Sequence, residues 1–203
     1  PLEIIKTYGL DPLRYYLIKE VSFGNDGNIS QERLEDCINS DLANNFGNLC
    51  QRVTAFAQKN CSAKIPEINK FNNEDLKILN KFTDNLDNIR DEVDKQNINF
   101  YIDFIVNALF EANKYFNDQE PWKKKGDLKR LNTIVYTSLE VIRKISFMLY
   151  PIIPQTIDKV LKIFNIDSNS ISLETIALHD ELKSGDPINK IDILFKKIEK
   201  KND

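Results

Sequence analysis

Apolar residues recur along this chain mostly at spacings of three and four, the period of an α-helix that buries one face. The clearest such stretch is 41–59, where five large side chains follow this spacing: Leu42, Phe46, Leu49, Val53 and Phe56. The pattern predicts a helix around which the rest of the chain is organised. Because each residue turns a helix by about 100°, a polar row follows the shoulder of the apolar stripe: Asn48, Arg52 and Lys59.

Capping residues and breaks divide the rest of the chain into further helices. Gly9 is expected to end the first, Asp11 (followed by a proline) to cap the second, and Ser30 to cap the third. A polar loop with two glycines, SFGNDGN over 22–28, is expected between the second and the third. The predicted helices cover 1–9, 11–21, 31–38, 41–59, 73–93, 97–117, 127–149 and 154–164.

Three further stretches lack a clear helical period. Residues 39–41 are expected to lead into the organising helix, and 60–72 to form a connector. Beyond 165 the periodicity is lost, although 193–195 is expected to be an apolar strap laid back on the helices. These elements predict an all-α helix bundle joined mostly by short loops.

Composition narrows the possible functions. With 203 residues, 41% of them hydrophobic, the chain is expected to form one large domain, or one domain with a small appendage. It contains no apolar run near the roughly 18 residues of a membrane span and no signal peptide, so a cytoplasmic protein is expected. Cys37, Cys50 and Cys61 include no C-x-x-C pair and, with the single His179, predict reduced thiols and no metal site. The formal charge of −3 means that a nucleic-acid contact requires a local basic patch.

The polar row of the organising helix is the first candidate for binding chemistry. Asn48 and Arg52 lie one turn apart and can present an amide and a guanidinium to the same object. Such groups can read the edge of a nucleobase. The alternative is that both side chains are merely solvated. Gly47, beside them, indicates either the close approach of another backbone or a position without special meaning.

A second candidate is the segment 118–130, DQEPWKKKGDLKR. Pro121 interrupts the helical pattern and leaves Trp122, the only tryptophan, in a connection. An aromatic ring among cations is the usual means of holding single-stranded RNA. The alternative is a tryptophan that closes the end of the bundle beside a solvated turn. The candidate phosphate-contacting cations are Lys123, Lys124, Lys125, Lys129 and Arg130.

Six segments occur in a characteristic order along the chain: 8–17 (YGLDPLRYYL), 22–30 (SFGNDGNIS), 38–52 (INSDLANNFGNLCQR), 120–124 (EPWKK), 150–160 (YPIIPQTIDKV) and 192–199 (DILFKKIE). Together they resemble the methionyl-tRNA synthetase family, and the likeness covers essentially the whole chain. The F-G-x-D-G loop favours this family over the valine, leucine and isoleucine synthetases. The resemblance implies the anticodon-binding helix bundle of class Ia synthetases.

The resemblance also implies roles for individual residues. In the family the bundle reads the CAU anticodon, and an Asn, an Arg and a later Trp meet its first base. These positions correspond to Asn48, Arg52 and Trp122, with Pro121 preceding the tryptophan as in the family pattern. Lys59 stands where relatives often carry a further basic contact.

The resemblance further implies a longer parent enzyme. Pro1 resembles the proline that follows the family's K-M-S-K-S loop, so the catalytic domain is expected upstream, outside this chain. The parent is expected to attach methionine to tRNA(Met), initiator and elongator, with ATP and magnesium. This chain by itself is expected to hold no cofactor and to be catalytically inactive.

The implied division is a stem-contact and linking segment over 1–30, an anticodon-binding bundle over 31–165, and a C-terminal strap over 166–203. Two other classes of function predict different features. A bundle enzyme would usually place E-x-x-H pairs inward, and the sequence has none. A helical protein-interaction scaffold without RNA specificity would need a large exposed apolar patch.

Overall fold

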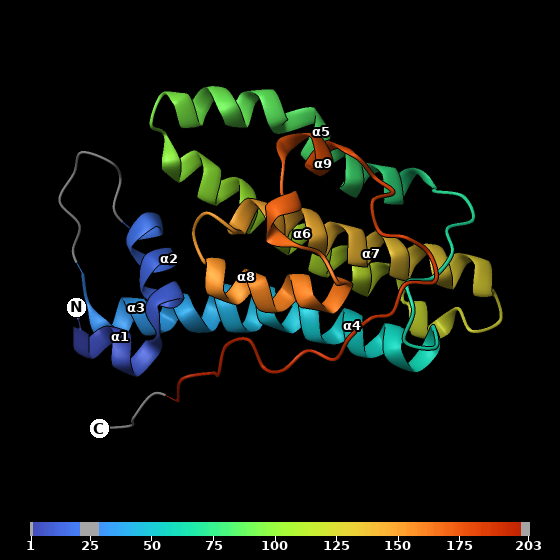
Figure 1. Ribbon diagram of the computed structural model, residues 1–203, viewed down its shortest axis with the longest axis horizontal. Coiled ribbons are helices and arrows are strands. Elements are labelled where there is room, and N and C mark those ends of the chain that lie inside the picture. The colour runs from blue at the N-terminus through green and yellow to red at the C-terminus, as the bar shows by residue number, and fades with distance from the viewer. Residues whose placement is uncertain (1, 21–28, 200–203) are drawn as a thin grey trace.

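A computed structural model describes residues 2–20 and 29–199 (Figure 1). The described residues confirm an all-α fold, with no strand among them beyond one isolated bridge between Lys64 and Pro187. The predictions for Pro1, Val21 and the loop 22–28 lie outside these ranges. The helices are α1 (Leu2–Tyr8), α2 (Leu10–Glu20), α3 (Gln31–Cys37), η1 (Ile38–Gly47), α4 (Asn48–Asn60), α5 (Asn73–Asp94), α6 (Ile98–Gln119), η2 (Pro121–Lys123), α7 (Leu128–Leu149), α8 (Pro154–Leu161), η3 (Lys162–Phe164), η4 (Ser168–Ser170) and α9 (Leu173–Ala177).

Helix α7 forms the centre of the bundle. It packs against α4, α5, α6 and α8, and its residues from Thr133 to Leu149 are all buried. The prediction of one inward face is therefore too narrow for α7, because neighbours cover it on every side. Polar groups enclosed in this way need partners, and the helix buries Glu140, Arg143 and Lys144.

The organising helix is longer than the sequence predicts, and part of it has the wider turn of a π-helix. Helices α3, η1 and α4 follow one another without a break, since the backbone stays right-handed helical at both junctions. Residues 39–41 do lead into the organising helix, but they are themselves helical, as part of the π-helix η1. Asp41 is held there from α2, by Lys19 Nζ at 2.5 Å and by the Tyr15 hydroxyl at 3.0 Å. Of the predicted apolar stripe, all members are buried except Phe56, which is half-buried.

Asp11 corrects another prediction. Helix α2 already begins at Leu10, and the Asp11 carboxylate does not cap it. Instead its Oδ2 accepts a hydrogen bond of 2.6 Å from the backbone N–H of Thr156, in the first turn of α8. Arg14 donates to the carbonyl oxygens of Pro151 and Ile152, just before α8. Asp11 therefore does cap a helix, but that helix is α8, which is remote in sequence.

The C-terminal segment runs back along the organising helix, as the red trace in Figure 1 shows. Its backbone pairs with the connector after α4, where Ile188 N–H donates to Ala63 O at 2.8 Å. At the other end, Asn39 exchanges two hydrogen bonds with the backbone of Ile198, at 2.8 and 2.9 Å. Leu194 and Phe195 are half-buried, but Ile193 points to solvent and is not part of the apolar contact.

Gly47 has a steric reason. A methyl group at this position would lie 3.0 Å from the carbonyl oxygen of Leu42 and 3.8 Å from the Phe195 ring. The wide turn of η1 and the C-terminal segment thus leave little room for a side chain. The close neighbours are a carbonyl of the same helix and the side chain of Phe195, so the predicted approach of another backbone is not what makes this position tight.

Within the described ranges, the helices are too short or too polar to cross a membrane. The same residues contain no cluster of three or more metal-ligating side chains. Cys37, Cys50 and Cys61 form no disulfide. Burial raises the pKa of the Cys61 thiol to about 11 and that of Cys37 to about 12, so both stay protonated at neutral pH.

Candidate nucleic-acid interface

The turn after α6 positions Trp122. Glu120 adopts a left-handed conformation (φ 44°) that ends α6. Pro121 then starts the single turn of η2, where its fixed φ suits the first helical position. Pro121 is buried while Trp122 is 40% exposed. The proline therefore anchors the turn, and the indole projects from it toward solvent.

Phe116 connects the tryptophan to the organising helix. This α6 residue is almost fully buried, and its ring centroid lies 6.0 Å from that of Trp122 in an edge-to-face arrangement. Its ring makes a similar contact with Phe56 on α4. The guanidinium carbon of Arg52 lies 5.6 Å from the same Phe116 centroid. One buried ring thus supports both of the principal candidate side chains.

Arg52 is oriented by a second residue of α6. Its Nη2 donates a hydrogen bond of 2.6 Å to Oδ1 of Asn117. The other donors of the guanidinium have no hydrogen-bond partner among the described residues. Asn117 therefore holds the side chain at one corner and leaves most of its planar fork able to bind a ligand.

The cavity at this site has a volume of about 350 Å³. Arg52, Lys59 and Asn60 reach it from α4, Phe116 from α6, and Trp122 from η2. The structure thus brings together two segments that are about 70 residues apart in sequence. The cavity is a shallow hollow open to solvent, and its volume is sufficient for one nucleobase.

Asn48 occupies a different position from Arg52. It is the first residue of α4, one turn before Arg52, and it is half-buried. It does not line the cavity, and its amide forms no hydrogen bond with a described residue. The structure therefore places Asn48 next to the site rather than in its wall.

The lysines beside Trp122 are exposed. Lys123 forms an ion pair of 2.7 Å with Glu120, in the same turn. Lys124, Lys125 and Lys129 have no ion pair with a described residue. These three exposed cations follow Trp122 within seven residues of the chain.

Arg130 differs from these lysines, because it is half-buried and already has partners within the bundle. Its guanidinium binds the fully buried Asp75 of α5 through two hydrogen bonds, at 2.5 and 2.9 Å, and also contacts Gln119 at 2.6 Å. Burial opposes its charge, but hydrogen bonding to Asp75 raises the pKa of Arg130. Asp75 also accepts a hydrogen bond from the hydroxyl of Tyr115. Arg130 thus has a structural partner, which the local basic pattern did not reveal.

Sequence reasoning missed Phe116 and Asn117 as parts of the site. In the sequence, Phe116 is one of many apolar residues in the predicted helix 97–117, and nothing in the pattern distinguishes it from the others. Asn117 lies among several asparagines of this chain and carries no distinguishing pattern. Only their positions, six and five residues before Trp122, could have drawn attention to them.

Comparison with known proteins identifies the fold. Residues 65–203 match the family described as the anticodon binding domain of methionyl tRNA ligase, and residues 1–54 match the class I tRNA synthetases (M). The first of these matches spans more than half of the chain.

Individual relatives agree with this assignment. The methionine–tRNA ligase of Brucella suis is 39% identical over 83% of this chain, and that of Thermotoga maritima is 35% identical over the whole chain. The chain covers 33% and 32% of these two relatives, so it spans about a third of their length.

Solved structures give the same result at the level of the fold. The free form of Mycobacterium tuberculosis methionyl-tRNA synthetase superposes with a TM-score of 0.91 at 30% identity, over 98% of this chain and 41% of that one. The form of the same enzyme in complex with methionyl-adenylate gives 0.89, over 96% and 39%. The bundle, the order of the matching segments and these similarities lead to one conclusion: this chain belongs to the methionyl-tRNA synthetase family, of which it contains the anticodon-binding domain.

Proposed function

We propose that this chain recognises the CAU anticodon of tRNA(Met), initiator and elongator. The observation that carries the proposal is the meeting of Arg52 and Trp122 on the Phe116 ring, at the rim of one cavity. A cation and an exposed aromatic face held in fixed relation suit a splayed-out base of a single-stranded loop. Lys59, which lines the same cavity, and the exposed Lys124, two residues after Trp122, can supply positive charge for the adjoining RNA backbone.

The chemistry of cytosine fits Arg52. The pairing edge of cytosine offers two acceptors, a ring nitrogen and a carbonyl, and one amino donor. The free donors of Arg52 suit both acceptors, but a guanidinium has no acceptor for the amino group. The carbonyl of Asn48 or a backbone oxygen completes the set. With uracil, donor and acceptor exchange places and at least one buried polar group stays unpaired.

Binding constants for two RNA hairpins test this proposal. Loops with CAU and UAU anticodons are titrated with the parent chain, Arg52→Ala and Trp122→Ala at two salt concentrations. Arg52→Ala is expected to reduce the preference for CAU by about tenfold or more. Trp122→Ala is expected to weaken both hairpins by about 1–3 kcal/mol and keep their ratio, because every base can stack.

The matched control is Arg90→Ala, which removes an exposed arginine from α5. It is expected to leave both binding constants unchanged. If Arg52→Ala keeps the full CAU preference, the assignment of Arg52 as a base reader is wrong. If the parent chain binds both hairpins equally and without salt dependence, a protein-interaction scaffold becomes the better explanation.

The activity of the whole protein is part of the same proposal. We infer a cytoplasmic ligase that joins methionine to tRNA(Met) with ATP and magnesium, its catalytic domain preceding this chain. The segment 1–30 would link the two parts, ahead of the bundle 31–165 and the strap 166–203. The purified chain alone is expected to show no methionine-dependent exchange of pyrophosphate into ATP. Such exchange would contradict the proposal that catalysis belongs to a separate domain.

A further inference from the structure

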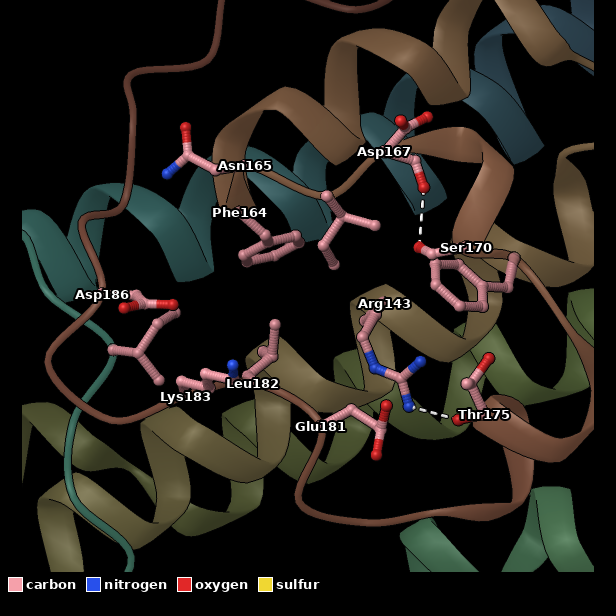
Figure 2. A pocket seen from close by; sticks show the side chains of 13 residues that line it. Arg143, Phe164, Asn165, Asp167, Ser170, Thr175, Glu181, Leu182, Lys183 and Asp186 are labelled. Atoms are coloured by element: carbon pink, nitrogen blue, oxygen red, sulfur yellow. Dashed lines mark hydrogen bonds between the residues drawn. The ribbon is translucent and has the colours of Figure 1, made fainter.

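Two arginines of α7 donate hydrogen bonds to neighbouring segments of the chain. In the second half of the helix, Arg143 donates to the Thr175 carbonyl of α9 at 2.7 Å, a contact that Figure 2 shows. In the first turn, Arg130 donates at 2.6 Å to Oε1 of Gln119, the last residue of α6. The first bond holds a short helix on the bundle. The second joins the two ends of the connection 120–129, which contains Trp122.

The guanidinium of Arg130 is itself held in one orientation. Its Nη1 and Nη2 bind the two oxygens of the fully buried Asp75, at 2.5 and 2.9 Å, so the guanidinium cannot turn without breaking a charge-assisted pair. Asp75 is also held by the backbone, because its Oδ2 accepts a hydrogen bond of 2.9 Å from the N–H of Asn72 in the capping box of α5. Arg130 therefore presents a fixed donor to Gln119.

The turn that follows Gln119 is not the one that its local sequence favours. Glu120 has a left-handed backbone, with φ 44°, which is unfavourable for a residue with a Cβ atom. It also precedes Pro121, and the residue before a proline prefers an extended backbone. A residue in such a conformation persists only where the surrounding contacts fix it. The bond between Gln119 and Arg130 supplies such a contact directly before Glu120.

The hydrogen bonds inside the turn have a different effect. The N–H of Lys123 donates to Glu120 O at 2.8 Å, and that of Lys124 donates to Pro121 O at 3.0 Å. These bonds join residues within 120–124, so they preserve the shape of the turn. The direction of the turn relative to α7 depends instead on the contacts at its ends. That direction decides where the partly exposed indole of Trp122 lies.

We propose that Gln119 is a positioning residue for anticodon recognition. By accepting a hydrogen bond from Arg130, it holds the turn in the orientation in which Trp122 meets a base. This inference rests on the proposed function, in which the indole stacks on the anticodon. Gln119 acts through Trp122 and makes no contact of its own with RNA. Loss of the bond therefore weakens stacking for every base and leaves the preference that depends on Arg52 unchanged.

The fluorescence of the purified chain without RNA tests the orientation of the indole. Trp122 is the only tryptophan, so the emission reports on this residue alone. Gln119→Ala removes the acceptor but leaves both bonds between Arg130 and Asp75, so the urea midpoint should stay that of the parent chain. Acrylamide should quench the emission of this variant more strongly, and its anisotropy should be lower, because the indole is less restrained.

Two further variants separate the hydrogen bond from other effects of the substitution. Gln119→Glu keeps an acceptor for Arg130 and should restore the quenching and anisotropy of the parent chain. This comparison is made without RNA, where the added charge does not oppose a phosphate. Gln155→Ala, at an exposed glutamine of α8, should behave as the parent chain does.

RNA binding then tests the consequence for recognition. Gln119→Ala is expected to bind hairpins with CAU and UAU anticodons about three- to tenfold more weakly, as part of the stacking contribution is lost. The ratio of the two binding constants should equal that of the parent chain. Gln155→Ala should leave both constants unchanged.

The contrary results are distinct. Quenching or CAU affinity equal to that of the parent chain in Gln119→Ala would overturn the proposal, and so would a failure of Gln119→Glu to restore the fluorescence. A changed ratio of the two hairpins would show that Gln119 affects base reading directly and not through Trp122. Equal binding of both hairpins by the parent chain would instead contradict the proposed function, and the fluorescence without RNA separates that failure from this one.

Discussion

Two arginines of this protein stack on phenylalanine rings in opposite surroundings. Arg52 lies at the edge of the cavity beside Trp122, with its guanidinium carbon 5.6 Å from the Phe116 centroid. Arg143 lies inside the bundle, 4.8 Å from the Phe147 centroid. The aromatic contact is similar, so it does not by itself distinguish a binding residue from a structural one.

The hydrogen-bond partners make the difference. Arg52 is half-buried and bonded to the neutral amide of Asn117. Arg143 is buried and bonded to the carboxylate of Glu140. An amide orients a guanidinium without neutralising it, and water can replace the bond. A buried carboxylate neutralises the charge. If either partner moves away, the other is left as an unpaired charge in an apolar interior. We infer that the first arrangement suits recognition and the second suits stability.

Removing the buried arginine is expected to give the largest effect. Arg143→Met leaves Glu140 without its cation and the Thr175 carbonyl without a donor, which should lower the free energy of unfolding by about 3–5 kcal/mol. Urea unfolding measures this change. The double variant Glu140→Leu/Arg143→Met should recover most of the loss, because no buried charge of the pair remains. A decrease of less than about 1 kcal/mol in the unfolding free energy of Arg143→Met would contradict the structural role of Arg143.

Arg130 offers an intermediate case. Arg130→Gln leaves the fully buried Asp75 without its charged partner and should cost about 2–3 kcal/mol of unfolding free energy. The matched variant Lys124→Gln, at an exposed lysine, should change stability by at most about 0.5 kcal/mol. Lys124→Gln should instead reduce the salt slope of RNA binding by about 0.7. If Arg130→Gln instead reduced the salt slope of RNA binding and left the stability unchanged, Arg130 would be a phosphate contact.

The pH dependence of stability sharpens the account of the α7 cluster. Burial lowers the pKa of Lys144 to about 8, below its ordinary value of 10.5. Between these values the unfolded chain holds a proton that the folded protein has released, so the contribution of Lys144 to the unfolding free energy rises with pH. From pH 7 to 9 the rise should be about 1 kcal/mol. Lys144→Met should abolish it.

The comparison is made between Lys144→Met and the parent chain at each pH. Burial raises the pKa of the Cys61 thiol, which acts in the opposite direction above pH 9, but both proteins share that effect. Parallel stability curves for the two proteins would contradict the lowered pKa of Lys144.

The smallest effect on folding is expected at the recognition site. Arg52→Ala removes a half-buried side chain with a neutral, exposed partner, so the unfolding free energy should change by no more than about 0.5 kcal/mol. The same variant is expected to lose its preference for CAU. If it unfolds as readily as Arg143→Met, then Arg52 is a structural residue as well, and the distinction between the two arginines fails.

The sequence by itself determined the helices and the identity of the family. Periodic apolar positions located the ends of α5, α6 and α7 to within about two residues, because each helix has to bury a face and so repeats every three or four residues. The order of short motifs indicated the synthetase family, and the comparisons confirm it. The polar row of α4 and the tryptophan after α6 were also visible as candidates.

Only the tertiary structure showed that side chains of the same type have different roles. The same basic segment contains the exposed Lys124 and the paired Arg130, and Asp11 caps a helix more than 140 residues away. Phe116 becomes the support of a site only where α4 and η2 approach α6. Local patterns record which face of a helix is buried. They do not record which remote group meets it, since that depends on how whole helices pack together.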